Sequence, residues 1–159
     1  MAHSFPTRRS SDLASATDDL RVLSRGIHPA VLSEGGLRPA LAALARRSAL
    51  PVELDLDVPA RLPEQVEVAA YYVVSEALTN VVKHAQATVA QVELRVSAAG
   101  LHLSVRDDGV GGAAPGPGSG LIGLIDRVEA VGGTISLTSS TGQGTALVAD
   151  LPVDGQDSC

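Results

Sequence analysis

The sequence predicts an α+β domain, a two-layer sandwich in which helices cover one face of a mixed, largely antiparallel sheet. Two observations predict it. Apolar periodicity along the chain changes in the order strand, helix, two strands, helix, two strands. The later strands come as hairpin pairs, which a doubly wound parallel fold does not contain. The chain of 159 residues is long enough for one such domain with helical segments before it.

Two helical stretches are expected before the first strand. The stretch Asp18–Ile27 carries apolar residues at helical spacing, and Gly26 and Pro29 end or kink it. A second stretch covers Gly36–Leu50 and stops at Pro51. These segments precede the part of the chain where strands begin.

A half-buried strand and the longest helix follow. Apolar and acidic residues alternate from Val52 to Val58, which predicts a strand with one buried face. The longest helix is expected from about Pro63 to His84, with Glu64 and Glu67 near the positive end of its dipole. Its apolar stripe consists of Val66, Ala70, Val73, Ala77 and Val81.

The remaining elements form two hairpins separated by a glycine-rich stretch and a helix. Alternating residues around Val92–Val96 and Leu101–Arg106 predict an antiparallel hairpin that turns at Ala99 and Gly100. The elements after it are the glycine-rich stretch Gly109–Gly120, a helix Leu121–Val131 ended by two glycines, and strands Thr134–Ser139 and Thr145–Leu151.

Composition excludes several classes of protein. A hydrophobic fraction of 45% with 19% charged residues is that of a globular chain. The net charge of −6 argues against nucleic acid as the main partner. The single cysteine, Cys159, excludes a disulfide framework and a cysteine metal cluster. No apolar run approaches the roughly 18 residues of a membrane span, so we expect no membrane contact by this stretch of chain.

Residues 1–13 do not fit the rest of the sequence. The segment His3–Leu13 has neither helical nor strand periodicity and resembles the in-frame translation of a DNA sequencing adapter. We expect the native sequence to begin near Ala14, as the 3′ end of a longer gene. The alternative is a native disordered N-terminus.

The first candidate for chemistry lies on the longest helix. Glu76, Asn80 and either Lys83 or His84 are spaced so that they project from one helix face. Amide and carboxylate oxygens suit Mg²⁺, and an ammonium group suits phosphate. Spacing alone favours the alternative, an ordinary solvated helix face.

The second candidate is the run from Asp107 to Gly112, directly after a strand. Its glycines would let the backbone approach a flat ligand, and a carboxylate there could accept a hydrogen bond from an exocyclic amine. The alternative is a glycine-rich turn. The run matches neither the dinucleotide-binding fingerprint nor a Walker loop.

The third candidate joins two glycine-containing segments. Gly118 and Gly120 precede Leu121 at a helix start, where free N–H groups attract anions. Gly144 and Thr145 follow in a later turn. The segment between the second and third candidates is expected to be either a lid or a linker.

Together these motifs resemble the ATP-binding domain of sensor histidine kinases, within the superfamily that includes DNA gyrase B, Hsp90 and MutL. The resemblance is carried by Glu-x3-Asn-x2-Lys-His, Asp-x-Gly-x-Gly, Gly-x-Gly-Leu and Gly-x-Gly-Thr in this order, and it covers about Leu20 to Pro152. The run from Gly123 to Gly133 is similar to kinases that act with LuxR/NarL-type response regulators.

The resemblance implies a role for each candidate residue, with ATP and Mg²⁺ as cofactors. Asn80 would hold Mg²⁺, and Glu76 would lie near the transferred γ-phosphate, with a possible part in metal binding. Asp107 would bind the adenine amino group. The remaining implied nucleotide contacts are Lys83 and His84 at the phosphates, Gly109 and Gly111 at the purine, Gly118, Gly120 and Leu121 at the lid and helix start, and Gly144 and Thr145 closing the pocket.

The chain departs from the family pattern in its phosphoacceptor. No histidine followed closely by acidic residues is present, and His28 before Pro29 resembles a structural position. His102 is expected on a solvated strand face. We therefore expect ATP binding without efficient autophosphorylation.

The implied organisation has four parts. Residues 14–50 would be the remnant of a dimerisation and phosphotransfer region, 51–153 the ATP-binding catalytic domain, and 154–159 a tail, after the segment 1–13. The expected partners are a LuxR/NarL-type response regulator and, in the full-length protein, a second copy; the expected location is cytoplasmic. Two alternatives stay open: a regulatory ATP-binding module, and an anti-sigma-factor-type serine kinase.

Overall fold

The computed structural model of the chain describes residues 29–113 and 120–154. Its helices are α2 (Ala30–Gly35), α3 (Leu37–Arg47), α4 (Glu64–Asn80) with a π-helical turn η2 (Val81–Ala85), and α5 (Leu121–Ala130). Its strands are β1 (Val52–Asp57), β2 (Ala90–Ser97), β3 (Gly100–Asp107), β4 (Thr134–Ser139) and β5 (Thr145–Leu151).

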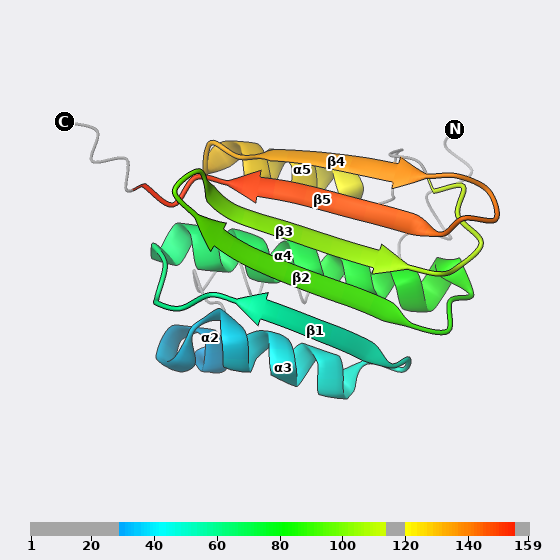
Figure 1. The fold of residues 1–159 in the computed structure, drawn as a ribbon, viewed down its shortest axis with the longest axis horizontal. Helices are drawn as coiled ribbons and strands as arrows, with labels where there is room; N and C mark the ends of the chain where they lie inside the picture. The colour runs from blue at the N-terminus through cyan, green and yellow to red at the C-terminus, as the bar shows by residue number, and fades with distance from the viewer. Residues whose placement is uncertain (1–28, 114–119, 155–159) are drawn as a thin grey trace, which may run out of the picture.

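The five strands form one mixed sheet in the order β1-β2-β3-β5-β4. β1 pairs with β2 in parallel, and the other neighbours pair antiparallel. Figure 1 shows α4 and α5 behind the sheet, with α2 and α3 beside β1. The parallel pair is joined through α4, as a crossover between parallel strands requires. The predicted α+β sandwich is confirmed.

The core lies between the sheet and α4. The predicted apolar stripe of α4 is buried at every position, and Val73 and Ala70 are fully enclosed. The inward side chains of β2 and β3 close the other side of this layer, with Val92, Leu94 and Leu103 at 0–1% exposure. Burial of apolar area on this scale is the main stabilising contribution to the fold.

The structure adds a short helix, α2, before the predicted helix Gly36–Leu50, which is observed as α3. α2 and α3 meet at Gly36, whose φ of +82° lies in the left-handed region that favours glycine. α3 ends at Arg47, three residues before the predicted end. Leu32 and Leu41 are 1% exposed and belong to the same core as the strands, so α2 and α3 fold as part of this unit. The predicted helix Asp18–Ile27 lies outside the described residues.

An ion pair fastens α2 to the start of α4. The Arg61 guanidinium donates to both carboxylate oxygens of Glu67, with the shortest separation at 2.9 Å, and also to the carbonyl oxygens of Leu32 and Ser33 at 3.4 Å. Glu67 is 2% exposed, and Arg61 supplies the cation that compensates for the burial of its carboxylate. The sequence predicted an acidic residue in the first turn here but not its burial or its pairing.

Helices α4 and α5 are joined by an aromatic contact. The Arg127 guanidinium carbon lies 4.2 Å from the centre of the Tyr72 ring, and Tyr72 also meets the edge of Tyr71. A cation over an aromatic face is an attractive contact. This contact fixes α5 against the helix that carries the first group of candidate residues. None of the described helices combines the length and apolar character that crossing a bilayer would require.

Candidate functional site

The end of α4 widens into the π turn η2. The turn covers Val81–Ala85, and Gln86 stops it with a φ of +51°. Turns of this kind are rare and occur often at functional sites. Asn80 and His84 both line a cavity beside this turn, whereas Lys83 is exposed and is not part of its lining.

The cavity has a volume of about 370 Å³ and lies between α4 with η2, the strands β3 and β5, and the start of α5. Its polar lining side chains are Asn80, His84, Asp107 and Thr145. The apolar lining side chains are Ala77, Val81, Ala85, Val105, Ala113, Leu121, Leu137 and Leu147. A mostly apolar pocket with a few convergent polar groups is the usual form of a small-molecule site.

Asp107 and Thr145 line the cavity from neighbouring positions on adjacent strands. They are partners in the register of β3 and β5, at the ends of these strands. Asp107 Oδ1 accepts a hydrogen bond from the N–H of Gly109 at 2.8 Å. Among the described residues, no donor reaches its second oxygen, so this oxygen is available to a ligand.

Two of the predicted site glycines lie where the backbone of one loop packs closely against the backbone of another, which leaves no room for a Cβ. Gly111 and Gly144 have φ of +66° and +73°. A Cβ at Gly111 would overlap the carbonyl oxygen of Ser140, and one at Gly144 would overlap that of Asp107. Backbone approach alone therefore explains these glycines, and the implied role of Gly111 at a purine stays a prediction.

Asp108 holds the loop to the segment before β2. Its Oδ1 accepts hydrogen bonds from the N–H groups of Thr88 at 2.8 Å and Val89 at 3.1 Å, and its Oδ2 accepts from the Thr88 hydroxyl. The Thr88 hydroxyl and then these backbone groups hold the pKa of Asp108 below its ordinary value of 3.8. This residue supports the turn beside Asp107.

The start of α5 lies against the first group of candidate residues. Gly120 has a φ of +78° and precedes Leu121, which lines the cavity. A Cβ at Gly120 would overlap the Glu76 carboxylate. Glu76 is therefore at the side of the cavity, next to the first residue of α5, and is not among its lining residues.

Six of the twelve predicted site residues line one cavity. They are Asn80, His84, Asp107, Gly111, Leu121 and Thr145. Glu76, Lys83, Gly109, Gly120 and Gly144 lie on the adjoining elements outside the lining, and Gly118 lies outside the described residues. Gly109 does not reach the cavity because it packs against Ala85.

Ser139 supports the site but was not among the residues predicted for it from the sequence. Its hydroxyl oxygen lies 2.7 Å from the Thr145 hydroxyl and accepts the N–H of Ala113 at 2.9 Å, so it ties the glycine-rich loop to β4 and β5. The apolar walls Val105, Leu137 and Leu147 were also not predicted as site residues. The sequence does predict that these three side chains point inward from their strands, and this pattern could have indicated that they line a pocket.

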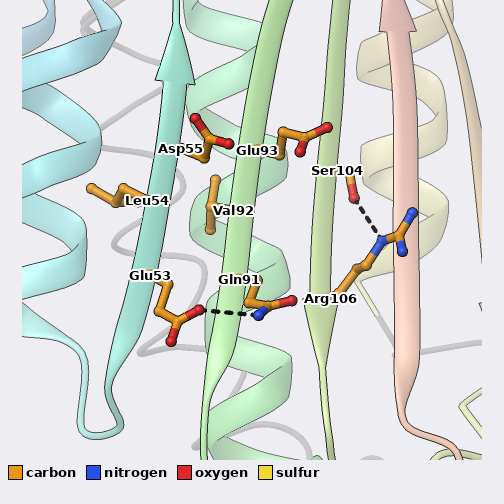
Figure 2. A pocket seen from close by; sticks show the side chains of 8 residues that line it. All are labelled: Glu53, Leu54, Asp55, Gln91, Val92, Glu93, Ser104 and Arg106. Carbon is orange, nitrogen blue, oxygen red and sulfur yellow. Dashed lines mark hydrogen bonds between the residues drawn. The ribbon is translucent and has the colours of Figure 1, made fainter.

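A second cavity of about 430 Å³ lies on the open face of the sheet, and Figure 2 shows its side chains. Glu53 accepts a hydrogen bond from Gln91 at 3.0 Å, and Arg106 donates to Ser104 at 3.2 Å. None of the predicted site residues lines it. Although larger, this hollow is lined mainly by polar and charged strand side chains, whereas the first cavity has mainly apolar walls.

The fold is an α+β domain, and its first cavity combines apolar walls with a few convergent polar side chains. The family model described as histidine kinase-, DNA gyrase B- and HSP90-like ATPase matches residues 65–155, more than half of the chain. The chain belongs to this family, and ATP is its ligand.

Similar proteins include sensor histidine kinases. The chain is 38% identical over 157 residues to the sensor histidine kinase NarS of Mycobacterium tuberculosis, covering 92% of this chain and 36% of NarS. It is 32% identical over 145 residues to the oxygen sensor histidine kinase NreB of Staphylococcus carnosus, covering 86% of this chain and 42% of NreB. The chain thus spans about two fifths of these relatives' length.

Solved structures show the same fold. The blue-light activated histidine kinase of Erythrobacter litoralis superimposes with a TM-score of 0.63 at 26% identity, over 76% of this chain and 41% of that one. The ATP-binding domain of PrrB from Mycobacterium tuberculosis gives 0.53 at 26% identity, over 73% and 93%. The histidine kinase AdeS of Acinetobacter baumannii, at 19% identity, gives 0.65 over 94% and 82% and supports the fold alone.

Proposed function

We propose that this chain is the ATP·Mg²⁺-binding catalytic part of a two-component sensor histidine kinase. It would transfer the γ-phosphate of ATP to a histidine on a dimerisation hairpin. The observation that carries the proposal is that a single cavity joins the Asn80 amide and the Asp107 carboxylate over apolar walls. Similarity to two sensor histidine kinases supports the same activity.

The adenine ring would lie against the apolar walls of the cavity. Val105, Leu147 and Leu121 provide apolar surface for the ring. The second carboxylate oxygen of Asp107 would accept a hydrogen bond from the exocyclic amino group, since its first oxygen is held by Gly109. The bond to Gly109 keeps the carboxylate in one orientation, which reduces the cost of ordering it on binding.

The donor set fits a magnesium ion held mainly by phosphates. The described residues contain no cluster of three or more histidine, cysteine, aspartate or glutamate side chains that could hold a metal alone. The Asn80 amide oxygen at the cavity is a hard ligand of the kind that Mg²⁺ accepts beside phosphate oxygens. When bound, the ion would neutralise phosphate charge and help to orient the γ-phosphate.

The protein's own contribution to transfer is positioning. His84 and the nearby Lys83 would contact the phosphates, and the N-terminus of α5 at Leu121 adds a favourable field for anions. Glu76 beside Gly120 would lie near the transferred group or its acceptor. Holding the reacting groups in line accounts for most of the acceleration in phosphoryl transfer.

The acceptor histidine and the regulatory partners belong to the proposal as well. No histidine of this chain matches the phosphoacceptor motif, so we expect ATP binding without efficient autophosphorylation. The full-length protein would act as a homodimer in the cytoplasm and pass the phosphoryl group to a LuxR/NarL-type response regulator.

Calorimetric titration with ATP·Mg²⁺ tests the nucleotide assignment. Asp107→Asn should weaken binding by about tenfold or more, because the carboxylate acceptor becomes an amide. Glu93→Gln is the matched control: it removes one carboxylate from the open face of the sheet and should leave the affinity unchanged. Equal affinities for the two variants would refute the role of Asp107.

A transfer assay separates a kinase from a regulatory ATP-binding module. The full chain is mixed with radiolabelled ATP and a supplied dimerisation hairpin from NarS. Label on the hairpin histidine, lost in Asn80→Asp, is expected. Intact ATP binding without any label would contradict the kinase proposal and favour the module.

A further inference from the structure

The two edges of the sheet differ in their chemistry. β1 forms one edge, and every second residue along it is acidic: Glu53, Asp55 and Asp57. Arg38 of α3 donates a hydrogen bond to the outer carbonyl oxygen of Leu56 at 2.9 Å. Charge and coverage of this kind prevent an edge strand from pairing with another chain.

β4 forms the other edge of the sheet (Figure 1). The stretch from Val131 to Ala149, which holds β4 and β5 up to its last two residues, contains no aspartate, glutamate, lysine, arginine or histidine. β4 has no proline, and its register with β5 is unbroken from Thr134 to Ser139. Among residues 29–113 and 120–154, the only backbone hydrogen bonds of Thr134–Thr138 are those to β5. Its outward backbone groups are therefore unpaired.

The sequence of β4 is self-complementary about its centre. It reads Thr-Ile-Ser-Leu-Thr from Thr134 to Thr138, so an antiparallel copy centred on Ser136 places like residues opposite each other. Thr134 would face Thr138 on the exposed side, and Ile135 would face Leu137 on the half-buried side. Threonine pairs and aliphatic pairs are favourable across antiparallel strands, and no like charges meet.

We propose that β4 pairs antiparallel with β4 of a second copy of this chain, centred on Ser136. The pairing joins the two sheets into one continuous sheet. Because the β1 edge is charged and covered by Arg38, the assembly closes at two copies and does not extend into a filament. It goes beyond the proposed function and uses a different surface from a dimerisation hairpin.

Sedimentation velocity of the full chain in a Cys159→Ser background tests the proposal, since this change removes the only thiol. The concentration series extends to about 1 mM, where an association with a micromolar dissociation constant is saturated. A concentration-dependent dimer is expected. Ser136→Lys should give a monomer, because the two lysines would meet at the centre of the interface. Ser136→Thr is the neutral control and should keep the dimer.

A charge exchange tests the register itself. Ser136→Asp alone should also be monomeric, and an equimolar mixture with Ser136→Lys should form a heterodimer, because position 136 then meets its opposite charge. This rescue also shows that both variants are folded, and both should keep the ATP affinity of the parent, since Ser136 is not part of the cavity.

Three results would overturn the proposal. A chain that stays monomeric at every concentration would show that β4 does not pair with a second copy. A dimer that persists in Ser136→Lys would place the interface elsewhere. A mixture that fails to associate would exclude this register.

Discussion

The carbonyl oxygen of Ala85 lies against the Cα of Gly109 and accepts the N–H of Val110 at 2.7 Å. This contact joins the end of the π turn to the glycine-rich loop. Two of the motifs recognised in the sequence are thereby packed directly against each other, and the positions of His84 and Asp107 depend on the same contact.

Replacing Gly109 by alanine tests this dependence. A Cβ would overlap the Ala85 carbonyl, so the loop must move away from the π turn. We expect Gly109→Ala to weaken ATP binding by about tenfold or more, through displacement of Asp107 and His84. Titration calorimetry measures the affinity, and thermal unfolding shows whether the fold persists. Unchanged affinity in a folded variant would show that the contact does not position the site.

Gly123→Ala is the control for Gly109→Ala, because an added Cβ at Gly123 would meet open space. Gly123 is exposed in α5, and a Cβ there would have no heavy atom within 4 Å. Alanine lowers the backbone entropy of the unfolded chain and favours the helix, so we expect stabilisation of about 0.5 kcal/mol with unaltered ATP affinity. Chemical denaturation measures the free energy of unfolding. A destabilised variant would mean that this turn of α5 has a tighter environment than the structure shows.

Arg61→Leu should detach α2 from α4. The substitution leaves the buried carboxylate of Glu67 without its cation, and we expect the midpoint of thermal unfolding to fall by roughly 5 °C. The double variant Arg61→Leu with Glu67→Gln should recover part of the loss, since no charge remains buried. Arg46→Leu, at an exposed arginine of α3, serves as control. Equal midpoints for Arg61→Leu and Arg46→Leu would contradict the importance of the ion pair.

Acid should loosen the glycine-rich loop through Asp108. Its pKa is lower in the folded chain than the ordinary 3.8, so its contribution to stability is complete above that value and is lost as the pH falls through the lower, folded pKa. We expect the free energy of unfolding of Asp108→Asn to fall less steeply below pH 4 than that of the parent chain. Glu129→Gln, on the exposed side of α5, should follow the parent. Parallel curves for all three would refute the prediction.

The strands and the long helix could be predicted because their periodicity reflects a single buried face. The bounds of Thr134–Ser139 and Thr145–Leu151 match the observed strands, and the order of elements is correct. α2 was missed because its six residues are too few to show a helical period between two breakers, Pro29 and Gly36.

Much of the site could be predicted from glycine and polar motifs, but its geometry could not. The π turn keeps nearly the same apolar pattern as a continuing α-helix, so the sequence does not reveal that His84 reaches the cavity while Lys83 does not. Glu67 is acidic at the start of a helix, where a solvated position is the ordinary expectation. Its burial is explained by its partner Arg61, in the segment before the helix, which the periodicity of the sequence does not identify.

The pairing of Asp107 with Thr145 also concerns how the molecule is made. The two residues are paired across β3 and β5 although the whole glycine-rich loop, α5 and β4 separate them in the chain. This polar pair of the cavity therefore exists only after the last strand has joined the sheet. During synthesis the nucleotide pocket is completed only when residues 145–151 have left the ribosome, and ATP that binds then stabilises the finished fold rather than any earlier intermediate.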